Sequence, residues 1–263
     1  MSGAPLDRGL LDFAVELADR AGRLAAERFF AGDFEVGIKP DGTEVTDADL
    51  AVEELIRTEL GRRCPDDAVY GEEAGAAPGV SGRRWIIDPI NGTRHFVHRV
   101  PLFGVSIAYE DEHGSALGVI NQPVARQIVY AGRGLGCRVR TGDAEAAPAL
   151  RETAELRRAR VEMVNPGRWP GDLLLALHQN VIVTGLAGGV VGVLTGLADA
   201  VVMAGSEMGY EDLAPLPVLL EEAGGRATDL SGGPLPSGPG TALVSTGRFH
   251  DALLGLLRPP GRP

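Results

Sequence analysis

The sequence has few cysteines and little positive charge. Its 263 residues include two cysteines, Cys64 and Cys137, too few for a disulfide framework or a cluster of thiolate metal ligands. Asp and Glu number 36 against 25 Lys and Arg, which gives a net charge of −11. Because nucleic-acid backbones are bound by basic surfaces, this balance argues against a nucleic-acid partner. A small phosphorylated partner remains compatible, since a bound divalent cation reverses the charge of an acidic site.

The chain also lacks a hydrophobic segment suited to a membrane or a secretion signal. Residues 1–11 carry Asp7 and Arg8 and contain no apolar core of the kind that signal peptides have. The most apolar later stretch, residues 181–203, is interrupted by several glycines and by Asp199, so it is too broken to span a bilayer. We therefore expect a soluble cytoplasmic protein with no membrane partner, and reduced cysteines.

Several catalytic motifs are missing as well. The sequence has no Gly-rich loop ending in Lys-Ser/Thr, which nucleotide-binding P-loops require. It has no Gly-x-Ser-x-Gly, the turn that presents the nucleophile in serine hydrolases. His95 and His98 lie close together, but the other histidines are scattered, which argues against zinc chemistry.

The most informative segment, Trp85–Thr93, reads Trp-Ile-Ile-Asp-Pro-Ile-Asn-Gly-Thr. Its apolar residues predict a buried strand, and Pro89 with the following Asn-Gly pair predicts a sharp turn. We expect the strand to deliver Asp88 to its end, beside exposed backbone carbonyls. Ligands gather at such strand ends in mixed α/β folds. Taken alone, the segment is better explained as an ordinary structural turn.

The flanking segments predict two lobes. Apolar spacing indicates helices over residues 10–30 and 46–63, with Leu50 facing inward in the second. Antiparallel strands are expected after the central segment, followed by alternating strands and helices in the second half. We predict an α/β (α+β) fold with an N-terminal lobe over residues 1–135 and a C-terminal lobe over residues 136–263.

Acidic side chains recur at turns and element ends. They are the pairs Asp47/Asp49, Glu72/Glu73 and Glu211/Asp212, and the single Asp88. Each has a structural explanation: Asp49 can cap its helix, and Asp212 can favour a helix N-terminus through the macrodipole. Together they form the oxygen-rich set that Mg²⁺ prefers. Paired cations in such a set can hold a phosphate ester and activate water.

In these motifs the sequence resembles the inositol monophosphatase superfamily of metal-dependent phosphatases. Four ordered segments carry the resemblance, at residues 41–49 (Asp-Gly-Thr-Glu-Val-Thr-Asp-Ala-Asp), 71–73 (Gly-Glu-Glu), 85–93, and 212–214 leading into 222–225. With their flanks they span residues 10–257. Residues 39–75 and 245–251 are most similar to bacterial histidinol-phosphate phosphatases. The resemblance implies a layered αβαβα fold of two packed lobes, commonly a homodimer.

The resemblance also implies roles for the matched residues. The metal ligands would be Glu72, Asp88, Ile90, Asn91 and Asp212. Glu72, Asp88 and the Ile90 carbonyl would hold a first cation. Asp88, Asn91 and Asp212 would hold a second. We assign Asp49, Thr93 and Glu72 as catalytic residues, with Thr93 hydrogen-bonded to Asp49 to help deprotonate the attacking water.

A substrate pocket is implied next to these residues. Its lining would be Gly92, Thr93, Arg94, His95, Leu186 and Glu207. The phosphate would lie against the backbone N–H groups of Gly92 and Thr93. Arg94 and His95, with His98 and Arg99, form either a cationic pocket wall or a solvated basic turn. Leu186 replaces a small polar residue common in the family, and Glu207 faces either substrate hydroxyls or solvent.

Asn91 is the main departure, because the family motif normally has Asp at this position. Asn keeps a carbonyl oxygen but loses the charge, and its NH₂ group would have to turn away from a cation. Losing even an indirect partner typically costs about 10–100-fold in metal affinity or activity. We therefore expect one Mg²⁺ site and a weakened second site. Glu211, where the family usually has Trp, either supplies some of the lost charge or faces solvent.

The function that fits best is a Mg²⁺-dependent phosphomonoesterase. Its substrate would be a small polar phosphate such as histidinol phosphate, an inositol or sugar phosphate, or a nucleotide. One alternative is a divergent enzyme with fewer cations that catalyses a non-hydrolytic or specialised-metabolite reaction. Another is a non-catalytic binder, although a binder needs no water-activating pair such as Asp49 and Thr93.

Overall fold

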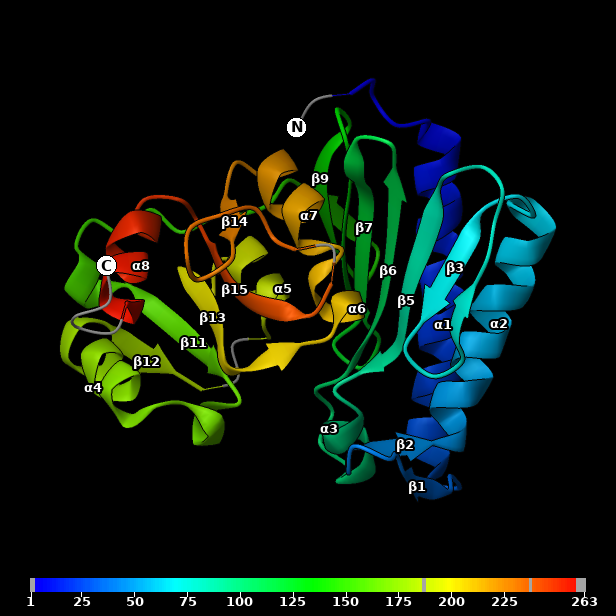
Figure 1. Cartoon of the computed structure of the whole chain (residues 1–263), viewed down its shortest axis with the longest axis horizontal. Helices are drawn as coiled ribbons and strands as arrows, with labels where there is room; N and C mark the ends of the chain where they lie inside the picture. The colour runs from blue at the N-terminus through cyan, green and yellow to red at the C-terminus, as the bar shows by residue number, and fades with distance from the viewer. Residues whose placement is uncertain (1–2, 186–187, 237, 259–263) are drawn as a thin grey trace.

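The computed structural model describes residues 3–185, 188–236 and 238–258, except the side chains of residues 205–207. These residues form five layers (Figure 1). The layers are the helices α1 (Arg8–Ala31) and α2 (Asp47–Arg63), an eight-stranded sheet, the helices α5 (Val190–Leu194), α6 (Tyr210–Leu213) and α7 (Leu216–Glu222), a five-stranded sheet, and the helices α4 (Gly171–Asn180) and α8 (His250–Leu257). The predicted αβαβα fold is thereby confirmed.

The eight-stranded sheet carries Asp88 and Asn91 near the end of one strand and Glu72 directly after another. Its order is β10-β9-β8-β7-β6-β5-β3-β4, and only the β3–β5 pair is parallel. The strands are β3 (Ala68–Gly71), β4 (Gly75–Ala77), β5 (Arg84–Asn91), β6 (Gly104–Asp111), β7 (Gly114–Gln122), β8 (Gln127–Gly132), β9 (Gly136–Thr141) and β10 (Ala144–Ala146). Strands β3 and β5 are neighbours and run in parallel. Glu72, which follows β3, and Asp88, near the end of β5, therefore lie at the same end of the sheet.

The division into lobes at residue 135 remains a prediction, and the sheet order favours a later boundary. Strand β9 pairs with β8, and β10 pairs with β9, so both belong to the large sheet. A division between β10 and the second sheet would keep each sheet whole.

The five-stranded sheet has the order β12-β11-β13-β15-β14. Its strands are β11 (Arg160–Val164), β12 (Ile182–Thr184), β13 (Ala200–Met208), β14 (Arg226–Thr228) and β15 (Gly240–Ser245). The alternation of strands and helices in this half is as expected. Helices α6 and α7 are separated at Pro215. Proline has no N–H to continue a helical ladder, and it suits the start of α7.

The first two helices begin and end at capping residues. Asp7 accepts a hydrogen bond from the Leu10 N–H, and Gly32 ends α1 in the left-handed region. Helix α2 begins with a capping box formed by Thr46 and Asp49. The prediction for Leu50 was wrong, because its side chain is 53% exposed. The inward face of α2 instead follows the spacing of Ala48, Val52, Ile56 and Leu60.

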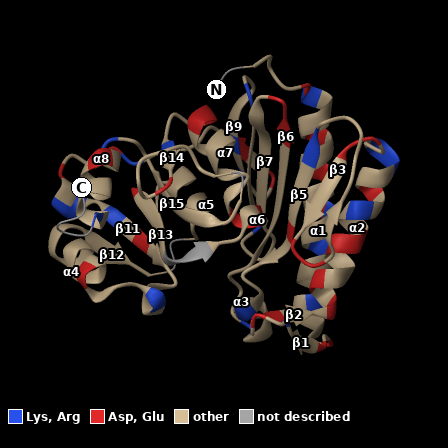
Figure 2. Ribbon diagram, viewed as in Figure 1, with Lys and Arg blue, Asp and Glu red and all other residues tan. Residues whose placement is uncertain are grey.

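Apolar clusters fill the spaces between the layers. One lies between α1, α2 and the large sheet, one between the two sheets around α5 and α7, and one between the small sheet, α4 and α8. Charged residues lie mainly on the outer helices and at element ends (Figure 2). No helix in the described parts of the chain is long and apolar enough to cross a membrane.

Candidate active site

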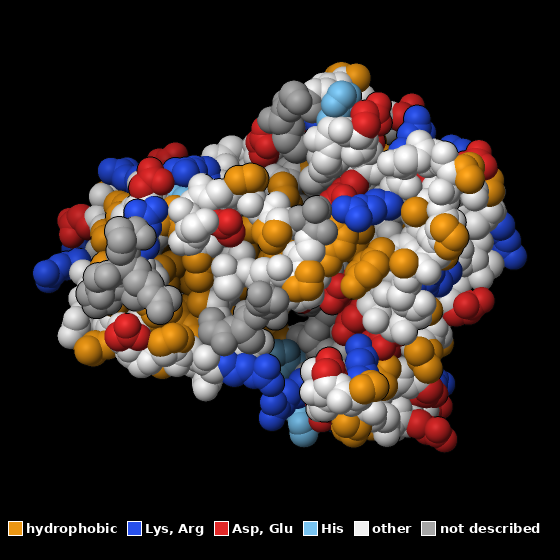
Figure 3. All heavy atoms as spheres, in the orientation of Figure 1, with side chains coloured by type: hydrophobic (Ala, Val, Ile, Leu, Met, Phe, Trp, Pro, Cys, Tyr) orange, Lys and Arg blue, Asp and Glu red, His pale blue; other side chains and the backbone are white. Residues whose placement is uncertain are grey.

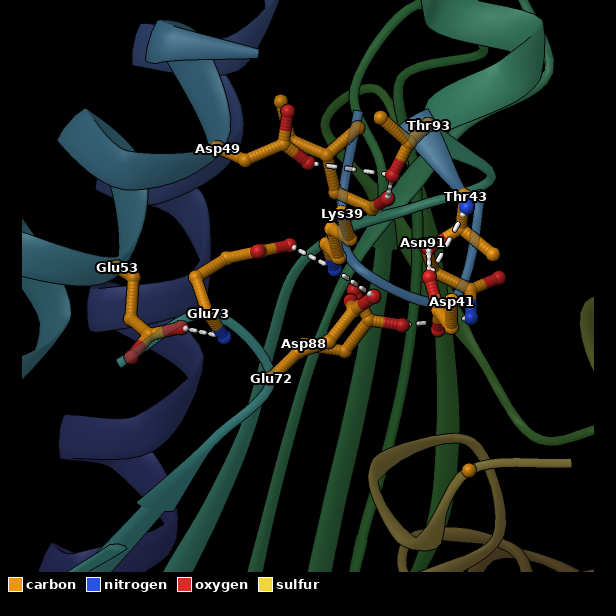
Figure 4. A network of polar contacts seen from close by, with 12 residues as sticks. Lys39, Asp41, Thr43, Asp49, Glu53, Glu72, Glu73, Asp88, Asn91 and Thr93 are labelled. Carbon is orange, nitrogen blue, oxygen red and sulfur yellow. Dashed lines mark hydrogen bonds and ion pairs between the residues drawn. The ribbon is translucent and has the colours of Figure 1, made fainter. Parts of the chain in front are cut away.

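The predicted catalytic residues meet where β3 and β5 end and where α2 begins. Asp49 comes from the first turn of α2, Glu72 follows β3, and Asp88 lies in β5. Figure 4 shows Asp49, Glu72, Asp88 and Thr93 in one polar network. In the space-filling view, acidic side chains border a hollow near the middle of the molecule (Figure 3).

Asp49 is fixed by its own helix cap. Its Oδ2 accepts hydrogen bonds from the Thr46 N–H at 2.8 Å and the Thr46 hydroxyl at 2.5 Å. Its Oδ1 lies 3.2 Å from Thr93 Oγ, which also lies 3.1 Å from the Ile90 carbonyl. The hydrogen bond from Thr93 to Asp49 that the resemblance implies is therefore present. Burial of Asp49 raises the pKa of its carboxyl, which makes it a stronger base.

The turn that presents Thr93 depends on Gly92. Gly92 has φ of +92° and precedes the short helix α3 (Thr93–Val97). A Cβ at this position would lie 3.1 Å from the Leu102 carbonyl oxygen. Glycine alone adopts such a conformation readily and leaves the space that the neighbouring backbone needs. The local sequence thus explains why Thr93 faces Asp49.

Lys39 pairs with both acids of the turn after β3. It lies between the hairpin strands β1 (Val36–Ile38) and β2 (Glu44–Thr46), and its Nζ is 2.8 Å from Glu72 and 2.7 Å from Glu73. Burial raises the pKa of Glu73 to about 7, against the effect of Lys39. Sequence reasoning did not assign Lys39 to the site. A signal existed, because Lys39 is the only lysine in the chain.

Glu53 is a second site residue that sequence reasoning missed. Its carboxylate accepts hydrogen bonds from the backbone N–H groups of Glu73 at 2.8 Å and Ala74 at 3.0 Å. Arg57 donates to the same group at 2.7 Å. Glu53 is 1% exposed and follows Val52 on the inward side of α2. A carboxylate next to this apolar face was the available signal, since buried acids need partners.

Asn91 connects Asp88 and Asp212. Its Nδ2 lies 2.7 Å from Asp88 Oδ2 and 2.6 Å from Asp212 Oδ1. The other Asp212 oxygen accepts the Gly209 N–H at 2.9 Å. Burial, then the nearby acids Glu72 and Asp212, raises the pKa of Asp88 well above its ordinary range. Burial and the nearby Glu211 likewise raise the pKa of Asp212.

The first predicted cation site fits the residues present. Glu72, Asp88 and the Ile90 carbonyl offer the oxygen ligands that Mg²⁺ prefers, and Asp88 Oδ1 is a buried atom without a hydrogen-bond partner in the structure. The second site does not fit, because Asn91 directs an N–H donor at both of its carboxylates. Among the described residues, no three His, Cys, Asp or Glu side chains already converge as a metal site.

The predicted substrate pocket is only partly described. Arg94 is exposed and His95 half-buried, both on α3. Leu186 lies outside the described residues, and Glu207 lies in β13 with a side chain outside them. The pocket roles of these residues therefore remain predictions.

Arg99 packs on an aromatic ring. Its guanidinium lies 4.8 Å from the centre of the Phe29 ring, which is a cation–π contact. His98 lies 3.8 Å from Glu44. Arg99 and His98 thus each contact another side chain of the N-terminal half, and their predicted part in a cationic pocket wall remains a prediction.

Comparison with known proteins finds similar sequences and structures over almost the whole chain. The profile of the Inositol monophosphatase family matches residues 7–259. The chain is 36% identical to a histidinol-phosphatase of Mycobacterium tuberculosis, over 93% of this chain and 96% of that protein. It is also 36% identical to a histidinol-phosphatase of Streptomyces coelicolor, over 94% and 96%. The structure superimposes on an IMPase of Thermotoga maritima with a TM-score of 0.84 and 27% identity, covering 95% and 96%.

Proposed function

Because the chain belongs to the inositol monophosphatase family, we propose that it is a Mg²⁺-dependent phosphomonoesterase whose substrate is histidinol phosphate. The hydrogen bond between Thr93 and Asp49 carries the proposal, because it supplies a proton acceptor beside a set of cation ligands. The similarity to two histidinol-phosphatases supports the choice of substrate. An inositol phosphate, a sugar phosphate or a nucleotide is the next substrate to test.

In this proposal the chain's own residues activate and orient the water. Thr93 Oγ takes a proton from the attacking water while its own proton moves toward Asp49 Oδ1, 3.2 Å away. The raised pKa of the buried Asp49 carboxyl favours this transfer. Glu72, Asp88 and the Ile90 carbonyl would hold Mg²⁺, whose charge makes water more acidic and offsets the charge of the phosphate. The N–H groups of Gly92 and Thr93 would orient the phosphate.

The test is phosphate release from a panel of phosphomonoesters that begins with histidinol phosphate. Release should require Mg²⁺ and stop with a chelator. Thr93→Val should lower kcat by about 10²–10⁴-fold, the usual contribution of general acid–base catalysis, while Thr93→Ser keeps the hydroxyl and most of the activity. Thr58→Val, at an exposed position of α2, is the matched control. Absence of Mg²⁺-dependent release from every ester would contradict the proposal.

A divergent, non-hydrolytic enzyme is the second candidate, and Asn91 is the observation that favours it. The amide removes a charge that hydrolysis with two cations would use. Phosphate release by Asn91→Asp but not by the natural chain would support this candidate. A non-catalytic binder has less support, because it would not need Thr93 beside Asp49.

The homodimer and the cytoplasmic location also remain predictions. A dimer would show a mass near twice 27.5 kDa in light scattering. A mass near 27.5 kDa at micromolar concentration would contradict it.

A further inference from the structure

Asn91 lies where the end of β5 meets helix α6. It is the last residue of β5 in the large sheet, whereas Asp212 lies on α6 in the second half of the chain. The Nδ2 of Asn91 donates to Asp88 at 2.7 Å and to Asp212 at 2.6 Å. One amide group therefore spans two carboxylates that are far apart in the sequence.

The orientation of this amide follows from the chemistry of its neighbours. Ionised carboxylates only accept hydrogen bonds, and an amide offers two N–H donors on nitrogen and acceptors on oxygen. When both carboxylates are ionised, the reverse orientation would direct Asn91 Oδ1 at two further acceptors, so that three acceptors would meet without a proton. Hydrogen-bonding chemistry is the proper basis for assigning an amide, and here it selects nitrogen.

This arrangement leaves a free carboxylate oxygen at the first predicted cation position but occupies the carboxylates of the second with N–H donors. Both oxygens of Asp212 have N–H partners, Asn91 Nδ2 on Oδ1 and the Gly209 N–H on Oδ2. On Asp88, Oδ2 is taken by Asn91, but Oδ1 is buried and has no partner. A cation between Asp88 and Asp212 would have to displace the amide and break both of its hydrogen bonds. A cation shared by Glu72 and Asp88 would break neither.

We propose that the Asn91 amide permanently takes the place of a second cation, so that this site binds a single divalent cation. The bridge from Asp88 to Asp212 then joins the lobes by hydrogen bonds, with or without metal. The inference rests on the proposed function for the identity of the first site. It goes further by assigning Asn91 a positioning role in place of the weak ligand role expected from its sequence position.

The experiment counts bound Mn²⁺ by isothermal titration and by electron paramagnetic resonance on the full chain. The natural protein should bind one Mn²⁺, with no magnetic coupling between ions. Asn91→Asp should bind two and show coupling, with the second site at least about 10–100-fold tighter than any second binding to the natural protein. Asn165→Asp is the matched control, because it adds the same charge at an exposed position remote from the motif in sequence. It should bind one.

Two ions on the natural protein, or none, would overturn the inference. This count is decisive even if Asn91→Asp does not fold. The count also needs no substrate, so it is separable from the proposed function. One bound ion without hydrolysis of any ester would contradict the function alone, whereas Mg²⁺-dependent hydrolysis with two bound ions would contradict the inference alone.

Discussion

Lys39 and Asn91 both donate hydrogen bonds to carboxylates of the site. A cation should displace Lys39 more easily than Asn91. Lys39 has a flexible four-carbon stem, so its ammonium group can move away from Glu72 and stay near Glu73. Asn91 has a short side chain at the end of a paired strand, with both carboxylates in contact. At the scale of single residues, we therefore expect a cation to displace Lys39 from Glu72 but not Asn91 from Asp88 and Asp212.

Acylation of Lys39 should accelerate when Mg²⁺ binds. The contacts with Glu72 and Glu73 raise the pKa of Lys39 against the opposing effect of burial, so the reactive neutral amine is scarce without metal. A cation at Glu72 would remove one partner and lower that pKa. Because Lys39 is the only lysine, mass spectrometry after treatment with an amine reagent reads it directly. The N-terminal amine is the internal reference, and an unchanged or slower rate would contradict exchange at Glu72.

The turn after β3 is held by helix α2. Glu53 receives the N–H groups of Glu73 and Ala74, and Arg57 donates to the same carboxylate one helical turn later. Arg57 also donates to the Gly75 carbonyl. Helix α2 therefore binds both N–H and carbonyl groups of the turn. The position of Glu72 thus depends on an ion pair between the buried Glu53 and the half-buried Arg57 of the neighbouring helix.

Glu53→Gln should destabilise the fold and weaken cation binding. The amide keeps the shape of the carboxylate but removes the charge that pairs with the half-buried Arg57, and a hydrogen bond to a charged group typically contributes about 1.5–3 kcal/mol. Urea unfolding measures the loss, and Mn²⁺ titration measures the effect on Glu72. Glu54→Gln, at an exposed position of the same helix, should change stability by less than about 0.5 kcal/mol. Equal effects of the two substitutions would refute the role of Glu53.

A buried histidine begins α8 and makes stability depend on pH. His250 is fully buried, with Nδ1 2.8 Å from Ser245 Oγ and Nε2 2.9 Å from Thr228 Oγ. Thr228 donates its own proton to the Asp229 carbonyl, so Nε2 must donate and Nδ1 accepts from Ser245. This network requires the neutral ring, and burial lowers the His250 pKa from 6.5 to about 4.

Stability should therefore fall as the pH falls from about 6.5 toward 4. The unfolded chain binds a proton at His250 in this range and the folded chain does not, so the stabilisation is complete above pH 6.5. The loss approaches about 3 kcal/mol at the lower limit, since one pKa unit corresponds to about 1.4 kcal/mol. Urea unfolding at several pH values should give a shallower slope for His250→Gln than for the natural chain. The exposed His178→Gln is the matched control, and parallel slopes for His250→Gln and the natural chain would contradict the prediction.

The sequence predicts those parts of the site that depend on local structure. The Thr46–Asp49 cap and the Gly92 turn are encoded within a few residues, and they suffice to place Asp49 and Thr93. The contact from Asn91 to Asp212 joins positions 121 residues apart. Its geometry follows from how the lobes pack, which no local pattern records. The sequence therefore indicated the amide but not the direction in which it points.

At the scale of the whole molecule, packing of α6 against the large sheet brings Asp212 to the site. Tyr210 and Ala214 form an apolar cluster with Ile86 of β5 and Ala108 of β6, and the Arg84 guanidinium lies 4.7 Å from the centre of the Tyr210 ring. The proposed ligands of the first cation, Glu72, Asp88 and the Ile90 carbonyl, all come from the large-sheet half of the chain. A single cation should therefore bind to residues of this half alone, while α6 is held by apolar packing and by Asn91.

Hydrogen exchange should show which lobe a cation contacts. With saturating Mg²⁺, amides of the turn at residues 72–75 and of α3 should exchange more slowly, because the cation restricts Glu72, Asp88 and the Ile90 carbonyl. Peptides covering α6 should be unaffected in the natural chain, since Asp212 already has N–H partners on both oxygens. In Asn91→Asp, a cation between the lobes should extend protection to α6, because opening of that helix would then require loss of a metal ligand. Mg²⁺-dependent protection of α6 in the natural chain would mean that Asn91 yields its place to a second cation.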